Sequence, residues 1–160
     1  MRKYSFLLLL AFLLTSCASP PVDKVLVEKS ENKMHLLKRG EIVKSYDISL
    51  GGNPVGHKVQ EGDLRTPEGE YLLIHKNDNS KFYRSITVSY PNEKDVVRAK
   101  TRGVDPGHGI VIHGFPNELG DVTGPFKPLN WTEGCIAVRN SEMDELFELV
   151  ALDTPIVIRP

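Results

Sequence analysis

Short segments in which apolar and polar residues alternate recur along the chain, separated by turn-forming residues. In residues 24–50 the apolar positions include Val25, Val27, Ile42 and Tyr46. Because successive side chains of a β-strand point to opposite faces, this period of two is typical of strands that bury one face. The sequence therefore predicts an N-terminal meander of β-strands.

Two later segments predict strands whose ends carry residues capable of chemistry. Residues 109–113 form an apolar run that ends at His113, and such a run predicts a central strand covered on both faces. Residues 134–138 predict a second short buried strand, which begins beside Cys135. If these strands are neighbours, their ends bring the imidazole and the thiol together.

Long segments of glycine, proline and charged residues interrupt the strand pattern at residues 51–69 and 114–133. Further strands are predicted over residues 70–75 and 85–90. Ordered loops of this length are uncommon in a compact domain unless they serve a function. We therefore expect the functional site to involve these loops.

A helix is predicted near the C-terminus. Its apolar residues recur at i, i+3, i+4 and i+7, and they are Met143, Leu146, Phe147 and Val150. Asn140 is predicted as its N-cap, and a last strand follows at residues 156–158. The predicted fold class is mainly β, a curled or two-layered β-sheet with one C-terminal helix packed on it.

The N-terminus predicts an export signal. Arg2 and Lys3 precede an apolar run at residues 6–14 that is too short to anchor a folded protein across a bilayer. Leu14 to Cys17 resemble the lipobox of bacterial lipoproteins, in which the cysteine is acylated. We therefore expect a lipoprotein signal peptide over residues 1–16, a lipidated tether over 17–23 that starts at Cys17, and one domain over 24–160.

The location implied by this resemblance is the periplasm, with acyl chains holding the protein in a membrane. Ala18 stands after the cysteine where an aspartate would signal retention, and it resembles the signal for the outer membrane. An unlipidated signal peptide and a buried apolar segment are the alternatives to this interpretation.

Cysteine usage makes Cys135 informative. Two cysteines in an exported protein would ordinarily form one disulfide, but acylation of Cys17 removes that partner. Cys135 is then a single thiol in an oxidising compartment, which is either buried and inert or kept for its reactivity.

A cysteine nucleophile needs a base, a group that orients the base, and donors for the oxyanion. His113 is the candidate base, and the carbonyl of Gly114 can orient its imidazole. Gly134 frees the backbone before the nucleophile, so the amides of Gly134 and Cys135 can point at the oxyanion.

Three motifs in order, TPEGEY at residues 66–71, IHG at 112–114 and TEGCI at 132–136, resemble the signature of the YkuD-type L,D-transpeptidases. The resemblance implies a β-rich catalytic domain whose cysteine attacks the carbonyl at the L-centre of diaminopimelate in a peptidoglycan stem peptide. D-Alanine leaves, and an amine or water then resolves the acyl-enzyme. Position by position, the resemblance makes Cys135 the nucleophile, His113 the base and Gly134 part of the oxyanion site.

The sequence also departs from the family pattern. Most members have histidine where Glu133 stands and arginine where Ala137 stands, and both residues are thought to help bind substrate. A branch of murein hydrolases that detach lipoprotein from peptidoglycan is similar in its Gly-Cys-Ile-Ala-Val run and in Trp131. The departures at Glu133 and Ala137 mildly favour cleavage of cross-links, or of the bond to wall-attached lipoprotein, over formation of cross-links.

Three further residues are candidate substrate contacts. Thr132 and Glu133 precede the nucleophile, and Glu133 stands where most members have the histidine. Arg139 could supply a positive charge for a substrate carboxylate. The predicted partners are thus peptidoglycan stem peptides and possible wall-attached lipoprotein.

Two other classes of protein remain open. A wall-binding lipoprotein could keep the fold without catalysis, and His108 could join His113 and Cys135 in a zinc site. A thiolate held by zinc could not attack a carbonyl. Acyl transfer by a thiol needs no cofactor, so neither a cofactor nor a metal is expected.

Charge and aromatic residues give weaker signals. The formal net charge of -1 provides no field that would gather nucleic acid, so no nucleic-acid partner is expected. Residues 98–102 are a basic stretch that is either a solvated face or a contact for anionic wall polymer. Phe115, Phe126 and Trp131 bracket the predicted cleft and serve either substrate or core.

Overall fold

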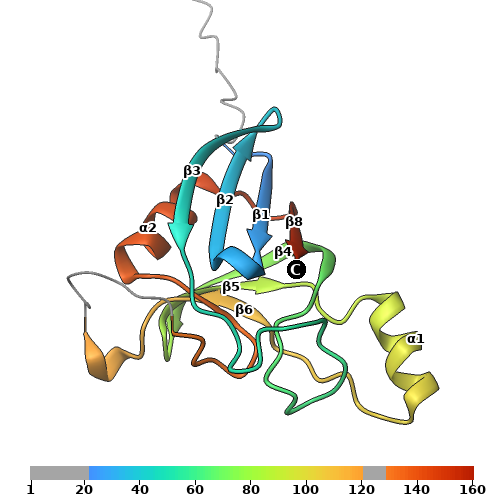
Figure 1. Cartoon of the computed structure of the whole chain (residues 1–160). Coiled ribbons are helices and arrows are strands. Elements are labelled where there is room, and N and C mark those ends of the chain that lie inside the picture. Colours follow the sequence, from blue (N-terminus) through green and yellow to red (C-terminus); the bar gives the residue numbers. More distant parts are fainter. Residues whose placement is uncertain (1–21, 121–128) are drawn as a thin grey trace, which may run out of the picture.

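The computed structural model describes residues 22–120 and 129–160, and its elements are labelled in Figure 1. The strands are β1 (Lys24–Glu28), β2 (Lys33–Lys38), β3 (Glu41–Asp47), β4 (Gly69–Ser80), β5 (Tyr83–Val88), β6 (Val111–His113), β7 (Ile136–Ala137) and β8 (Thr154–Arg159). The helices are α1 (Glu93–Arg102) and α2 (Asn140–Leu149), with short 3₁₀ turns η1 (Lys29–Glu31) and η2 (Asn117–Leu119).

All eight strands belong to one mixed sheet, in the order β3-β2-β1-β8-β4-β5-β6-β7. β1 pairs with β8 in parallel and β6 pairs with β7 in parallel, whereas the other neighbours are antiparallel. In Figure 1 the meander of β1 to β3 stands across the direction of β5 and β6, so the sheet is strongly curled. The predicted mainly β class is confirmed.

The curl brings the two edges of the sheet together. After β3 the chain runs to Ser49, whose amide donates to the carbonyl of Ala137 in β7 at 2.9 Å and whose carbonyl accepts from the Ala137 amide at 2.8 Å. Leu50 and Gly52 continue this pairing through hydrogen bonds to the backbone of Thr132. Sheet closure therefore fixes the segment that carries Cys135 between β6 and residues 49–52.

The core fills the inside of the curl and is covered by α2. The core includes the fully buried Ile48, which follows the edge strand β3. It also includes Ile86, Ile112 and Ile136, which come from β5, β6 and β7 near the other edge of the sheet and are fully buried. The predicted apolar stripe of α2 packs there: Met143 and Leu146 are buried, and Phe147 packs against the core. Burying a side chain of this size contributes about 1.5–3 kcal/mol, so α2 helps hold the sheet closed.

The first residue of α2 differs from the prediction. Arg139 is the N-cap and Asn140 is the first helical residue. The side-chain oxygen of Asn140 accepts instead from the amide of Phe115 at 2.9 Å. Asn140 therefore ties the start of α2 to the segment that follows β6.

The prediction of a single helix was wrong, because α1 occupies the basic stretch. Asn92 and Asp95 form a capping box, and Gly103 ends the helix in a left-handed conformation. Only Asp95 and Ala99 of this helix are buried. A helix that packs so little surface lacks the apolar stripe on which the prediction relied.

The predicted signal peptide, Cys17 and Phe126 lie outside the described residues. Val22, which belongs to the predicted tether, is already buried, and the amide of Asp23 donates to Leu37. Neither helix of the described part is long and apolar enough to cross a membrane.

Candidate active site

Cys135 and His113 lie at the ends of two adjacent parallel strands. β6 and β7 pair Ile112 with Ile136 and His113 with Ala137. Ile112 and Ile136 face the core, so strand alternation places Cys135, Ala137 and His113 on the opposite face. The structure thus brings the two predicted catalytic residues to one face of the sheet, two positions apart in register.

The His113 imidazole is fixed by one hydrogen bond and a group of aromatic rings. Its Nδ1 lies 2.6 Å from the carbonyl oxygen of Gly114, and because a carbonyl only accepts, Nδ1 carries the proton and Nε2 is left as a base. The rings of Phe82 and Trp131 lie 4.5 Å and 5.7 Å from the imidazole, centroid to centroid. Phe115 in turn stacks on Trp131. Two of the predicted cleft aromatics therefore help to shape the histidine's surroundings.

The turn before Cys135 is held by Thr132 and requires glycine at 134. The Thr132 hydroxyl accepts from the Gly134 amide at 3.2 Å and donates to the Cys135 carbonyl at 2.7 Å. Gly134 has φ +132°, and a Cβ there would lie 2.6 Å from the carbonyl oxygen of Arg65. The Cys135 amide makes no hydrogen bond among the described residues, so it remains available to an oxyanion.

Gly114 is required for a different reason. A Cβ at this position would lie 2.4 Å from the side-chain oxygen of Asn140 and 3.0 Å from Cβ of Tyr83. The absence of a side chain lets the Gly114 carbonyl approach the imidazole while Asn140 holds the chain beyond it. This close approach explains the glycine of the IHG motif.

The half-buried Cys135 thiol opens into a cavity of about 420 Å³. Lys58, His108, Gly109 and Glu133 are among the residues that line it. The sulfur lies 3.7 Å from the Gly109 carbonyl, which is its hydrogen-bond acceptor within the described part of the chain. The thiol is thus hydrogen-bonded to the backbone of residue 109 and not to the His113 imidazole, and catalytic hydrogen bonds often form only when substrate binds.

The surroundings favour a neutral pair. Burial raises the pKa of the Cys135 thiol, and the Glu133 carboxylate raises it further, whereas the Val111 amide and the Lys58 ammonium lower it. Burial lowers the pKa of His113, against the effect of its hydrogen bond to Gly114. At neutral pH the site therefore holds a protonated thiol and an unprotonated imidazole.

Lys58 and Glu133 allow a matched test of these charges. We expect Lys58→Met to raise the pKa of Cys135 and Glu133→Gln to lower it, so that alkylation of the thiol at pH 7 becomes several-fold slower and several-fold faster, respectively. The Lys58 side chain is buried and bonded to Asp63 at 3.0 Å, but Asp63 keeps three backbone donors, so the loop should stay folded. The alkylation rate of each variant is measured against pH to obtain the pKa of Cys135. A shift of this pKa in the same direction in both variants would contradict the assigned effects of Lys58 and Glu133.

The structure places the predicted substrate contacts unequally. Glu133 is exposed and lines the thiol cavity, whereas Thr132 is buried with its hydroxyl engaged in the turn. Arg139 caps α2, where its amide donates to Glu142 at 2.9 Å. Of the three candidates, Glu133 is the one that lines the thiol cavity.

The zinc alternative is not supported by the described residues. Their only group of three donors lying within 4.8 Å of one another is Glu28, Glu31 and His35. His108, His113 and Cys135 do not meet that condition, so this part of the structure gives no three-ligand set at the thiol.

Two residues near the site and one on the other side of the long loop have contacts that the sequence did not reveal. Phe82 comes from the β4–β5 turn and Lys58 from the long loop, and only closure of the sheet brings them near β6 and β7. His57, on the other side of that loop, has Nε2 3.2 Å from the buried carboxylate of Asp95 and Nδ1 3.0 Å from the amide of Glu68. The sequence carries no local signal for these long-range contacts.

Comparison with known proteins places this geometry in a family. The YkuD profile, described as the L,D-transpeptidase catalytic domain, matches residues 23–158. YafK of Escherichia coli (strain K12), provisionally named an L,D-transpeptidase, is 28% identical over 180 aligned residues, which cover 94% of this chain and 64% of that protein. YqjB of Bacillus subtilis (strain 168), named in the same provisional way, is 25% identical and is covered to 69%.

Solved structures agree with the sequence comparison. Pgp2 of Campylobacter jejuni, a helical cell shape determining protein, superposes with a TM-score of 0.64 at 28% identity over 86% of this chain and 47% of that one. An L,D-transpeptidase of Enterococcus faecium shares the fold with a TM-score of 0.57 at 17% identity, over 86% of this chain and 50% of that one. The chain spans about two thirds of the length of YafK and about half that of Pgp2. With the profile matched across nearly all of the described residues, this chain belongs to the family of L,D-transpeptidase catalytic domains.

Proposed function

We propose that this chain is a thiol acyltransferase that acts on diaminopimelate-containing stem peptides of peptidoglycan, with Cys135 as nucleophile and His113 as base. The observation that carries the proposal is the placement of both residues on one face at the ends of β6 and β7, with the Cys135 thiol opening into a cavity. Family membership supports the substrate class.

Acylation begins from the neutral pair. As the Cys135 sulfur attacks the carbonyl carbon, Nε2 of His113 accepts the thiol proton, and the Cys135 amide donates to the oxyanion. Collapse of the tetrahedral intermediate breaks the C–N bond, and the imidazolium gives its proton to the leaving amine of D-alanine. A thioester remains on Cys135.

The second half-reaction reverses these roles. The amine of another stem peptide, or a water molecule, attacks the thioester and loses a proton to His113. The C–S bond breaks, and the imidazolium returns a proton to the sulfur. An amine acceptor gives a new cross-link, and water gives hydrolysis.

Hydrolysis is a second candidate because of Glu133. Its carboxylate lines the thiol cavity at a position where most of the family has histidine, so it could orient a water molecule there. Cleavage of cross-links or of wall-attached lipoprotein would then use the same nucleophile. Arg139 remains a proposed substrate contact through its positive charge, whereas the buried Thr132 would act on substrate only indirectly, by holding the turn before Cys135. If Arg139→Ala leaves the KM for stem peptides unchanged, that residue has no such role.

Muropeptide analysis by mass spectrometry separates these outcomes. Cell walls with and without attached lipoprotein are incubated with the protein and with its Cys135→Ala variant. Release of D-alanine with new cross-links identifies a transpeptidase, whereas loss of cross-links or attached lipoprotein without new ones identifies a hydrolase. If walls treated with either protein are identical, the chain is instead a wall-binding protein.

We also propose that the chain is exported to the periplasm and anchored there in the outer membrane through acylated Cys17. Such an anchor would keep the domain beside the wall. Labelled palmitate should enter the wild-type protein in cells and not a Cys17→Ser variant. Equal labelling of the two would rule out this anchor. The likeness to Pgp2 further suggests a part in cell shape.

A further inference from the structure

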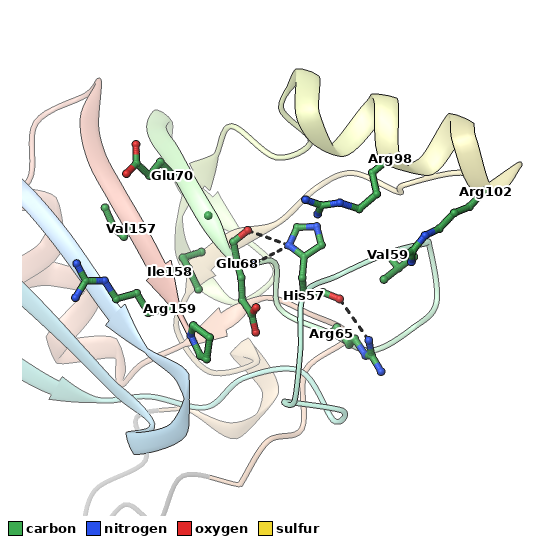
Figure 2. A pocket seen from close by; sticks show the side chains of 12 residues that line it. His57, Val59, Arg65, Glu68, Glu70, Arg98, Arg102, Val157, Ile158 and Arg159 are labelled. Atoms are coloured by element: carbon green, nitrogen blue, oxygen red, sulfur yellow. Dashed lines mark hydrogen bonds between the residues drawn. The ribbon is translucent and has the colours of Figure 1, made fainter.

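A second, larger cavity of about 680 Å³ lies on the other side of the long loop from the thiol. Four arginines line it: Arg65 from the loop, Arg98 and Arg102 from α1, and Arg159 from β8. Figure 2 shows Arg98 and Arg102 reaching from α1 towards His57, with Arg159 at the opposite side. We call this cavity the arginine groove. Its volume is in the range of cavities that hold a ligand the size of a short peptide.

The charge of the arginine groove is mostly unbalanced. Arg102 and Arg159 form no ion pair with any described residue, and the nearest carboxylate to Arg98 is that of Asp95 at 3.7 Å. Of the two lining glutamates, Glu68 is already bound by Lys29 at 2.8 Å. Glu70 is the one remaining lining carboxylate against four lining arginines, so the groove is cationic although the whole chain is nearly neutral.

Arg65 offers an unsatisfied donor at this place. Its Nε is buried and has no hydrogen-bond partner among the described residues, and its Nη1 reaches the His57 carbonyl only at 3.5 Å. A buried guanidinium nitrogen without an acceptor is costly, so the described residues leave the Arg65 guanidinium incompletely hydrogen-bonded where it lines the groove. The side chain is therefore suited to meet a ligand in the groove.

The long loop is a common wall between the two cavities. His57, Val59 and Arg65 line the arginine groove, whereas the intervening Lys58 and Leu64 line the thiol cavity. The Arg65 carbonyl also packs against Gly134, next to the nucleophile. A ligand in the groove would thus lie one layer of chain away from the reacting centre.

We propose that the arginine groove binds a carboxylate-bearing stretch of peptidoglycan stem peptide outside the part that reacts at Cys135. This rests on the proposed wall substrate. Guanidinium groups match carboxylates with paired hydrogen bonds, and the apolar lining residues Val59, Val157 and Ile158 suit the methyl and methylene groups of such a peptide. The groove would hold the wall while the thiol site selects the bond.

The test measures co-sedimentation of the full chain, carrying Cys135→Ala, with purified insoluble peptidoglycan. Two double variants are compared. The arginine pair carries Arg102→Ala and Arg159→Ala. The lysine pair carries Lys24→Ala and Lys100→Ala, which remove the same charge from α1 and the sheet but outside the groove. We expect binding about tenfold weaker for the arginine pair, a loss of about 1.4 kcal/mol, and within twofold of the parent for the lysine pair. Thermal unfolding of both variants checks the fold.

A second arm uses peptidoglycan whose carboxylates have been converted to amides. The parent protein should bind amidated peptidoglycan about tenfold more weakly than it binds native peptidoglycan. Substituting the arginine pair should cause no further loss of binding to the amidated wall. Equal losses in both variants, no loss in the arginine pair, or full binding to amidated wall would each overturn the proposal. Turnover of soluble stem peptides by the wild-type chain is measured separately, so failure of the enzyme proposal is distinguishable from failure of the groove.

Discussion

Replacing His113 by alanine is expected to lower acyl-enzyme formation about 10³-fold, within the range typical for loss of a general base. The resting thiol is protonated because burial raises the pKa of Cys135, so attack requires a base to take its proton. Nε2 of His113 is the candidate, since Nδ1 is engaged with Gly114. Single-turnover kinetics with a stem-peptide donor measures the loss.

His75 provides the matched control for this substitution. It lies exposed on β4, away from the cavity that contains Cys135, so His75→Ala should keep the wild-type rate. A loss of less than about tenfold in His113→Ala would contradict the assignment of His113 as general base.

The same residue predicts the pH profile. Only the unprotonated imidazole accepts a proton, and burial lowers the pKa of His113 below its usual value. Activity should therefore persist as the pH falls below about 6.5 and decline only where His113 becomes protonated. This acid limb should be absent from the residual activity of His113→Ala. An unchanged limb in the variant would show that another group titrates.

Replacing Gly134 by alanine is expected to destabilise the fold by about 3 kcal/mol and to abolish measurable turnover. The added Cβ would lie 2.6 Å from the Arg65 carbonyl, in a backbone conformation with φ +132° that side chains rarely adopt. Relief of the contact must move either the long loop or the cysteine turn, and both shape the thiol cavity. Urea unfolding measures the first effect.

A Gly40→Ala control separates the free-energy cost of backbone strain from the cost of the close contact with Arg65. Gly40 also has a positive φ, +83°, but a Cβ there would meet no atom within 4 Å. Gly40→Ala should therefore cost only about 1–2 kcal/mol and leave turnover intact. If Gly134→Ala is no less stable than Gly40→Ala, the packing of Arg65 against the cysteine turn is not as the structure has it.

The strands could be predicted because each one carries a local pattern. The apolar runs before His113 and after Gly134 are buried, as are Val25, Val27 and Tyr46 of the alternating segment, whereas Ile42 is exposed on the edge strand β3. The helix α1 was missed because it buries little more than Ala99, so its signals are limited to the cap residues Asn92 and Asp95. Those residues were available in the sequence and would have found it.

Sheet closure could not be predicted, and it controls much of the site. The pairing of Ser49 with Ala137 joins segments far apart in sequence, and neither segment carries a pattern that selects the other. Closure in turn decides that Lys58 lies near the thiol and that Arg65 packs on Gly134. A motif can name a nucleophile, but its electrostatic surroundings depend on such long-range contacts.

Thr132 illustrates a second limit. Its place in the TEGCI motif made it a candidate substrate contact, yet its hydroxyl is hydrogen-bonded to both the Gly134 amide and the Cys135 carbonyl. A motif residue can therefore serve the shape of the turn, which the sequence alone does not distinguish from contact with substrate. The arginine groove shows the converse, since Arg65, Arg98 and Arg159 line one cavity although they share no sequence motif.

The central claim is that Cys135 forms a covalent acyl-enzyme, and intact-protein mass spectrometry tests it most directly. The chain is mixed with a stem-peptide donor that ends in D-alanine, and the reaction is stopped by acid within one turnover. We expect a gain in mass equal to that of the donor less D-alanine, located on the peptide that contains Cys135, and no gain in the Cys135→Ala variant. D-Alanine release without any adduct, or an adduct that persists in Cys135→Ala, would contradict it.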